Sequence, residues 1–471
     1  MFVVLAAPHY PPRNVGGVEF YVQSLARWLH QQGHRVEVVC VEQIEYGPFP
    51  RVTARVDQTE GFPVHRLTVR WRKGPLGIRD RFDNPAMELW FKAYLHSRRP
   101  DVLHLHSGYL LTVSPLRAAM KMGLPTVVSL HDFWFLCAHH TLLRPSGQVC
   151  PGPEDPTGCA YCWLSQSRRY RWIEQGFLRL GIRDPHRKAG RLLQPWPFFA
   201  PWAQIMQQRL PTTIGVLNRA TAIIVPTEFL AHLHRSFGMR QEGVYQIPYF
   251  VPSDLRRPDG DRRDPSALHV VYIGQVAPHK GLHVLIQGVQ EAMRKVGERG
   301  RKIQLTIYGN DQAFPVYRAH LERLIGSEGN ICFAGVLSRD RLGEALAEAD
   351  VLALPSIWPE ITGIVGLEAL AMGVPVLASQ IGGISEVISH GQNGWLVPPG
   401  DPQAIAEILA CWAQEPEALE RLRAQARALF SKEQAMEALM SLYRDIIRIE
   451  APRFADRPEP ELQEIAEEHP I

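Results

Sequence analysis

Short apolar runs alternate with amphipathic helical stretches along most of this 471-residue chain. Several runs are apolar at every position, which is typical of strands in a parallel sheet that is covered by helices on both faces. The predicted strands of the first half are 2–7, 35–41, 102–106, 126–131 and 222–226. This order predicts a doubly wound α/β domain.

The second half repeats the alternation. Its predicted strands are 270–274, 303–308, 331–333, 351–355 and 374–378. Asp401 is predicted to be a helix N-cap, because Pro402 follows it at the first helical position. The sequence therefore predicts a second doubly wound domain, and the two domains are expected to face each other across a cleft.

Composition predicts where the domains begin and end. Residues 252–265 are charged and contain Pro and Gly, so we interpret them as a linker between domains at 1–251 and 266–430. Residues 431–450 are predicted to form a helix that packs back on the first domain. The acidic, Pro-containing tail 451–471 is expected to be loosely ordered.

Two glutamates flank a glycine-containing loop in the second half. Glu360 follows the predicted strand 351–355, and Glu368 falls early in the next predicted helix. Gly363 and Gly366 lie between them, where the backbone N–H groups of a helix start bind anions and glycine lets a diphosphate approach. Taken alone, the pair also fits two solvated acids, so the interpretation depends on the surrounding sequence.

These surroundings resemble the retaining glycosyltransferase family 4, within the glycosyl transferases group 1, whose two-domain fold is called GT-B. The matching stretches are 8–19, 129–132, 272–281 (YIGQVAPHKG) and 355–397 (PSIWPEITGIVGLEALAMGVPVLASQIGGISEVISHGQNGWLV). The last of these is long and highly specific. The resemblance implies that the first domain lies on the acceptor side and that the second binds the nucleotide sugar.

The resemblance also implies roles for individual residues. Glu368 would bind the ribose of the donor, Glu360 the transferred sugar, and Lys280 the donor diphosphate. Glu360, Lys280 and His131 would form the catalytic group, with His131 at the sugar-facing edge of the first domain. The remaining donor-binding positions are Gly16, Gly17, Gln275, Gly363, Ile364 and Val365.

Two of the aligned positions depart from the family pattern. The family has an arginine on the diphosphate where this chain has Gln275, which can hydrogen-bond a phosphate oxygen but carries no charge. Either Lys280 and helix N-termini suffice, or another arginine supplies the charge, or the donor is held differently. Thr362 stands where the family often has an aromatic residue, so the shape of the sugar pocket is not predicted.

The implied reaction moves a sugar from a UDP- or GDP-sugar to a hydroxyl of a polysaccharide, a lipid-linked glycan or a small molecule, with retention of the anomeric configuration. No Asp-x-Asp motif follows a strand, so we expect no cofactor in catalysis. The alternatives are a sugar-nucleotide epimerase on the same fold and a non-catalytic nucleotide-sugar-binding protein. The paired glutamates favour the transferase over the epimerase.

Residues 137–210 break the alternating pattern, and we interpret them as an insert in the first domain. Four cysteines gather at its start and end in a Cys-x2-Cys pair: Cys137, Cys150, Cys159 and Cys162. Four thiolates suit tetrahedral zinc or an iron–sulfur cluster, whereas reduced thiols or a disulfide pair would be the plain structural alternative. We predict a structural zinc.

The insert continues with a basic and aromatic stretch at 164–210, which has nine basic residues against two acidic ones. Basic residues beside Trp and Phe suit an anionic membrane surface or a lipid-phosphate acceptor. A solvated basic helix over a small aromatic core explains the composition equally well.

The whole chain has 51 basic and 48 acidic residues, so nucleic acid is not an expected partner. No apolar stretch approaches the roughly 18 residues of a membrane span, and the first residues lack the pattern of a signal peptide. Three of the seven cysteines stand alone in apolar segments, which suits a reducing compartment. We therefore expect a cytoplasmic protein, with peripheral membrane contact through the insert.

Overall fold

The structure is a computed structural model of the chain, and it describes residues 1–12, 16–58, 60–153, 155–166, 176, 186–251, 255, 263–297 and 300–455. The side chains of 186–189 and 450–455 are not among the described features. Most of the predicted linker, five of the nine basic residues of the stretch 164–210 and most of the acidic tail lie outside this part of the chain.

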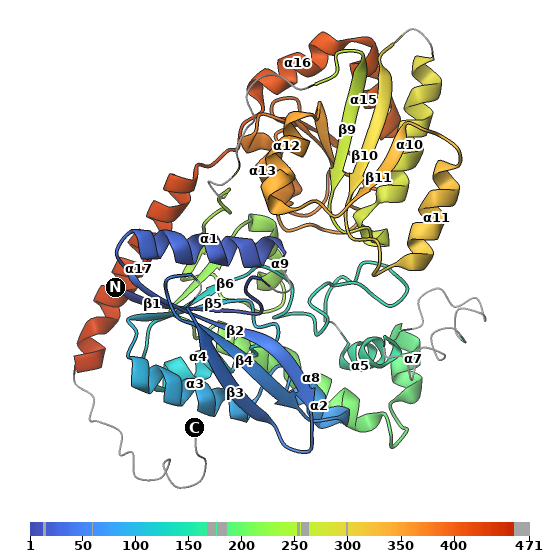
Figure 1. Ribbon diagram of the computed structural model, residues 1–471. Coiled ribbons are helices and arrows are strands. Elements are labelled where there is room, and N and C mark those ends of the chain that lie inside the picture. Colours follow the sequence, from blue (N-terminus) through green and yellow to red (C-terminus); the bar gives the residue numbers. More distant parts are fainter. Residues whose placement is uncertain are drawn as a thin grey trace.

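The first domain is built on an eight-stranded sheet with the strand order β3-β4-β2-β1-β5-β6-β7-β8 (Figure 1). The pairing of β3 with β4 is antiparallel, and the other described pairs of this sheet are parallel. The strands are β1 (Phe2–Ala7), β2 (Arg35–Tyr46), β3 (Arg51–Asp57), β4 (Val64–Trp71), β5 (Val102–His106), β6 (Thr126–Ser129), β7 (Ala222–Val225) and β8 (Val244–Gln246).

Strands β3 and β4 were not predicted, because charged side chains interrupt their apolar pattern. No strand was expected between residues 41 and 102. In β4 the apolar Val64, Leu67 and Val69 are interrupted by Arg66, which is itself buried. The Arg66 guanidinium donates hydrogen bonds to the carbonyl oxygens of Tyr10 and Pro11, at 3.2 and 2.7 Å. Because its guanidinium is hydrogen-bonded, this arginine can lie in the interior. It interrupts the run of apolar residues by which a buried strand is identified in a sequence.

Helices cover both faces of this sheet (Figure 1). Side chains of β1 alternate between the two layers, because Val3 and Leu5 pack in the cluster that includes α1, while Val4 packs in the cluster that includes α3, α4 and α8. The helices of this domain are α1 (Gly17–Gln31), α2 (Gly74–Arg79), α3 (Pro85–Arg98), α4 (Ser114–Lys121), α5 (Pro156–Ser165), α7 (His186–Leu193), α8 (Ala200–Leu217) and α9 (Glu228–Arg235).

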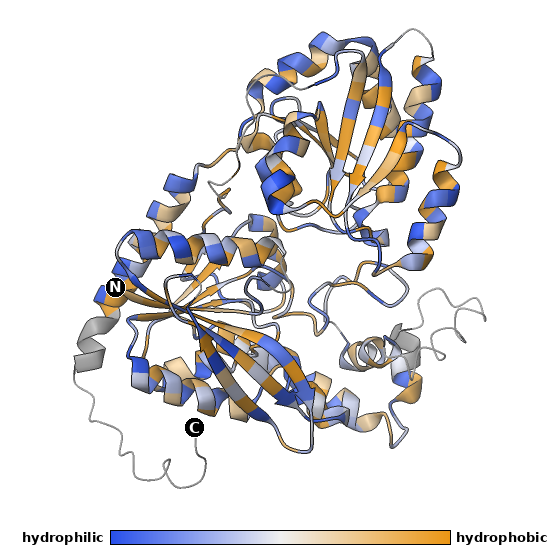
Figure 2. Ribbon diagram, in the orientation of Figure 1, coloured by the Kyte–Doolittle hydropathy of each residue, from blue (hydrophilic) through white to orange (hydrophobic). Residues whose placement is uncertain are grey.

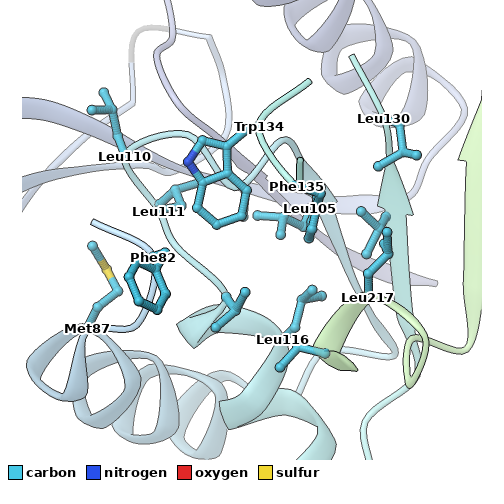
Figure 3. Packing of buried hydrophobic residues seen from close by; sticks show 14 of the residues in the cluster. Phe82, Met87, Leu105, Leu110, Leu111, Leu116, Leu130, Trp134, Phe135 and Leu217 are labelled. Atoms are coloured by element: carbon cyan, nitrogen blue, oxygen red, sulfur yellow. The ribbon is translucent and has the colours of Figure 1, made fainter. Parts of the chain in front are cut away.

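The segment after β6 is part of this core. Trp134 and Phe135 lie beside Leu105 and Leu111 in the packed interior, as Figure 3 shows. All four of these side chains are almost fully buried. The connection from β6 toward the cysteine-rich region is therefore anchored where it leaves the sheet.

The second domain has a six-stranded parallel sheet with the order β11-β10-β9-β12-β13-β14. The strands are β9 (Ala267–Ile273), β10 (Lys302–Tyr308), β11 (Ile331–Gly335), β12 (Val351–Leu354), β13 (Val376–Ser379) and β14 (Gly394–Val397). The helices are α10 (Leu282–Val296), α11 (Pro315–Ile325), α12 (Leu342–Ala347), α13 (Ile364–Ala371), α14 (Ile384–Val387), α15 (Pro402–Gln414) and α16 (Pro416–Gln425), with short 3-10 turns η1 (Pro278–Lys280) and η2 (Arg339–Arg341). Asp401 caps α15, as predicted, by accepting hydrogen bonds from two backbone N–H groups.

The last helix, α17 (Lys432–Ala455), leaves the second domain and lies along the first (Figure 1). Met436, Leu439 and Met440 share a buried cluster with residues of the first sheet. The Tyr443 hydroxyl lies 2.6 Å from Nδ1 of His104 on β5. Both side chains are completely buried, so this hydrogen bond joins the end of the chain to the middle of the first sheet.

Hydropathy follows the same layered arrangement, with hydrophobic strands inside and amphipathic helices around them (Figure 2). The predicted fold of two doubly wound α/β domains is confirmed. Within the described residues, no helix is both long and apolar enough to cross a membrane.

Replacing Tyr443 with Phe is expected to lower the free energy of unfolding by about 1–3 kcal/mol, because a ring nitrogen of His104 loses its partner in the interior. Denaturant unfolding measures this change. Tyr245→Phe, at a tyrosine that is 43% exposed, serves as the control and should change stability by less than about 0.5 kcal/mol. Equal stability of the two variants would contradict the anchoring role of α17.

Candidate active site

The two domains meet through segments that follow the carboxyl ends of their strands. The carboxylate of Glu386, on α14, accepts hydrogen bonds from the backbone N–H groups of Glu228 and Phe229, both at 2.7 Å. These N–H groups open α9, so a side chain of the second domain caps a helix of the first. Open α/β sheets bind ligands at this same edge, which makes the domain contact the candidate site.

Lys280 and Glu360 form an ion pair at this edge. The Lys280 ammonium lies 2.5 Å from Oε1 of Glu360, and the Ser356 hydroxyl donates to the same oxygen at 2.6 Å. Lys280 ends η1, and Glu360 lies in the loop between β12 and α13, so the pair joins two loops that are distant in sequence. The structure thus brings together two of the three predicted catalytic residues.

Glycines allow these loops to approach so closely. Gly281 has a φ of +71°, and a Cβ there would lie 1.8 Å from the carbonyl oxygen of Pro355. Gly382 has a φ of +62°, and its Cβ would lie 2.2 Å from the carbonyl oxygen of Glu360. A side chain at either position would force the loop that carries Glu360 away from its neighbours.

The start of α13 lies against the first domain. Gly363, with a φ of +69°, is the N-cap of this helix, and Ile364 and Val365 supply its first backbone N–H groups. A Cβ on Gly17, the first residue of α1, would lie 2.7 Å from Cδ1 of Ile364. The helix start and the Gly16–Gly17 loop, which were predicted separately, therefore face each other across the domain contact.

Glu368 lies one turn further along α13 and is buried. Its carboxylate is paired with Arg339 of η2, and the Arg339 guanidinium lies 5.3 Å from the centre of the Phe20 ring on α1. The sequence analysis missed Arg339. Its position just after β11, at the same sheet edge as the other site residues, was the available signal.

Gln275 lies in the loop between β9 and η1, and its side chain is exposed. Its carbonyl oxygen accepts a hydrogen bond from the Tyr272 hydroxyl at 2.7 Å. The backbone of Gln275 thus fixes the start of the loop that leads to Lys280. Arg339, which follows β11, is an arginine at the same edge of the second domain.

His131 lies inside the first domain, two residues beyond the end of β6. Its Nδ1 is 2.5 Å from the Tyr249 hydroxyl, and its Nε2 is 2.9 Å from Nδ1 of His106. Burial lowers the pKa of His131 to about 3, so the ring is neutral at physiological pH. Both ring nitrogens are engaged with protein groups, which suits a residue that orients its neighbours.

Asp132 follows His131 and was not singled out from the sequence. Its carboxylate accepts hydrogen bonds from the Ser107 hydroxyl at 2.7 Å and from the Trp134 N–H at 2.8 Å. Burial raises the pKa of Asp132. The nearby Glu19 accepts a hydrogen bond from the Gly16 N–H at 2.9 Å, and its pKa is raised chiefly by burial and further by Asp132. The Glu19 carboxylate therefore lies on the Gly16–Gly17 loop, and Asp132 is near enough to affect its pKa.

The four clustered cysteines line one cavity of about 50 Å³, and all four are free thiols. His139 lines the same cavity, and its buried Nε2 has no hydrogen-bond partner. Among the described residues no three His, Cys, Asp or Glu side chains are grouped as ready metal ligands. A metal ion would therefore have to draw these thiols together.

Structural zinc at this cavity stays a prediction, and metal analysis of the purified protein tests it. We expect about one zinc per chain, lost in the double variant Cys159→Ser/Cys162→Ser, because removing two of four thiolates leaves an incomplete tetrahedral set. Cys332→Ser, at an exposed cysteine elsewhere, should keep the zinc. Protein with neither zinc nor iron would refute the prediction, and iron with visible absorption would replace zinc with an iron–sulfur cluster.

Two family models match the chain. "Glycosyl transferases group 1" matches residues 261–429, and "Glycosyl transferase 4-like domain" matches residues 16–180. An alpha-D-kanosaminyltransferase from Streptomyces kanamyceticus is 27% identical over 247 residues, which cover 49% of this chain and 62% of that protein. This match spans less than two thirds of the relative's length.

A D-inositol 3-phosphate glycosyltransferase from Mycolicibacterium vanbaalenii is 29% identical over 383 residues, which cover 76% of this chain and 80% of that protein. The crystal structure of HepE from Anabaena in complex with UDP has the same fold, with a TM-score of 0.58 at 18% identity over 97% of this chain and 100% of that one. The two family models lie on the two domains, and the chain belongs to the glycosyl transferases group 1, with the GT-B fold.

Proposed function

We propose that this glycosyltransferase moves a sugar from a UDP- or GDP-sugar to an acceptor hydroxyl, with retention of the anomeric configuration and without a catalytic metal. The observation that carries the proposal is the Lys280–Glu360 pair, which lies on the loops beside the start of α13. A cation, a carboxylate and helix N–H groups are what a sugar diphosphate needs: charge neutralisation for the phosphates and acceptors for the sugar hydroxyls.

In this proposal the donor lies along α13 and its preceding loop. The Glu368 carboxylate accepts hydrogen bonds from the ribose hydroxyls, and Glu360 accepts them from the transferred sugar. The Lys280 ammonium and the N–H groups of Ile364 and Val365 hold the diphosphate. Glu360 already binds the Lys280 ammonium, so the donor would enter a site whose charges are positioned in advance.

Gln275 leaves without a positive charge the position where the family has an arginine, and Arg339 is suited to supply that charge. It is a cation at the carboxyl edge of the second sheet, paired with the carboxylate that the ribose is proposed to use. The donor would compete for Glu368 and release the Arg339 guanidinium toward the phosphates. We propose that Arg339 supplies the second positive charge that the family places at the position of Gln275.

The chemical step forms a bond between the acceptor oxygen and the anomeric carbon, and it breaks the bond from that carbon to the diphosphate oxygen. The acceptor proton passes to the departing diphosphate on the same face of the sugar. Lys280 and the helix N–H groups stabilise the negative charge that develops there. Asp132 and Glu19 lie on the acceptor side and are suited to accept hydrogen bonds from an acceptor's hydroxyl groups.

The named relatives support this reading at the level of reaction class. They include an alpha-D-kanosaminyltransferase and D-inositol 3-phosphate glycosyltransferases, and HepE is known with UDP bound.

Incubation with a panel of UDP- and GDP-sugars, without an acceptor, separates the candidate functions. A transferase is expected to release UDP or GDP slowly by transfer to water. An epimerase would change the sugar without releasing the nucleotide, and a non-catalytic binding protein would bind the donor without any turnover. Either of those two outcomes would contradict the proposal.

Lys280→Ala is expected to lower kcat by roughly 10²- to 10³-fold, because the departing diphosphate loses a preorganised cation. Steady-state kinetics with the donor found in the panel measure this loss. Lys295→Ala removes a lysine from the other end of α10, 3.8 Å from Glu407, and is expected to leave kcat within about twofold. Equal kcat for the two variants would remove Lys280 from the mechanism.

We also propose that the face around α7 and α8 contacts an anionic membrane surface. Leu192, Trp196 and Phe198 are 67%, 57% and 43% exposed and lie within the basic and aromatic stretch at 164–210. Exposed aromatic and aliphatic side chains beside basic residues are typical of peripheral membrane contacts.

Flotation with phosphatidylcholine vesicles, with and without phosphatidylglycerol, tests this contact. We expect binding to the anionic vesicles at low salt, and at least a fivefold loss in Leu192→Ser/Trp196→Ser, because about 0.8 kcal/mol per buried CH₂ is removed. Phe49→Ser is the control, at a residue that is 77% exposed on the loop between β2 and β3. Absence of binding by the wild type would refute the proposal.

A further inference from the structure

The loop that carries Glu360 also carries Trp358, which joins it to the other domain. The Trp358 indole N–H donates a hydrogen bond to the carbonyl oxygen of Thr141 at 2.6 Å. Thr141 lies between the first two cysteines of the cysteine-rich region, 217 positions away in sequence. Trp358 and its neighbour Ile361 both pack against the core cluster of the first domain.

The ring of Trp358 lies among the residues of the donor site. Its centre is 5.1 Å from the Lys280 ammonium, 5.6 Å from the His279 ring and 5.7 Å from the Phe133 ring. An ammonium over an indole is attracted by the negative face of the ring. Lys280 is therefore held from two sides, by the Glu360 carboxylate and by the Trp358 ring.

The acceptor of the indole hydrogen bond is fixed in place. Thr141 lies between His140 and Leu142, whose φ angles are +53° and +52°. The Leu142 carbonyl accepts from the Cys150 N–H at 2.7 Å, and the His140 carbonyl accepts from the Phe133 N–H at 3.3 Å. Left-handed backbone at non-glycine residues persists where the surrounding contacts determine it. The position of the Thr141 carbonyl is therefore fixed by the residues on either side of it.

We propose that Trp358 is a positioning residue, which sets Lys280 and Glu360 in their working arrangement only while the cysteine-rich region of the first domain is docked against the donor loop. This inference rests on the proposed function. Separation of the domains would break the hydrogen bond to Thr141 and release the loop, so closure and assembly of the site occur together. With the domains apart, a donor bound to the second domain would contact a Lys280 side chain that is no longer held in place. Transfer of the donor sugar to water is slow in that state.

Trp358→Phe tests the hydrogen bond, because phenylalanine keeps a ring beside Lys280 but has no N–H. We expect kcat to fall roughly two- to tenfold, the worth of one hydrogen bond, while the dissociation constant for UDP or GDP alone stays within about twofold. Trp358→Ala removes the ring as well, and nucleotide affinity should then fall together with kcat. Trp395→Phe is the matched control, at a tryptophan whose ring neighbours, His390 and Trp412, belong to the second domain.

The proposed function and this inference can fail separately. If the wild type neither binds nor turns over any nucleotide sugar, the proposed function is wrong. If the wild type is active and Trp358→Phe has the kcat of Trp395→Phe, the positioning role is wrong. Thermal unfolding of each variant identifies a loss of kcat that comes from misfolding, and Trp358→Phe losing kcat and nucleotide affinity in equal measure would also contradict the inference.

Discussion

The close approach of three loops in the second domain determines the rest of the site. Gly281 and Gly382 let the backbones of η1 and of the segment after β13 press against the loop after β12, where a Cβ would overlap carbonyl oxygens. This packing brings the Lys280 ammonium to the Glu360 carboxylate, although the two residues are 80 positions apart in sequence. Both side chains are mostly buried, so each charge is stabilised by the other, and the Glu360 carboxylate also accepts a hydrogen bond from the Ser356 hydroxyl.

The same packing places the site at the domain contact. The loop that holds Glu360 reaches the first domain through Trp358, and the helix that holds Glu368 begins beside Gly17. Glu386, a little further along the chain, caps α9 of the first domain. Segments that follow strands β12 and β13 thus contact segments that follow β1, β6 and β7 of the first sheet, so the candidate donor site of the second domain lies against the first.

The sequence predicted much of this arrangement and missed a definable part. Strands such as Phe2–Ala7 and Val351–Leu354 are apolar on both faces, so their pattern identifies a doubly wound sheet. β4 escaped because Arg66 is buried there against backbone carbonyls that lie about 55 residues away in sequence. The roles of Arg339 and Trp358 were not predicted for a related reason. Their partners, Glu368 and the Thr141 carbonyl, are brought near only by the tertiary fold.

Hydrogen exchange with and without UDP or GDP tests most directly whether this domain contact is the donor site. If it is, nucleotide binding protects the backbone amides of η1 and the start of α10, and those of the loop and first turn around Gly363, because their N–H groups face the diphosphate. Amides of β3 and β4, at the far edge of the first sheet, should exchange at the same rate in both conditions. Protection that appears elsewhere, with no change around Lys280 and Gly363, would contradict the assignment of the site.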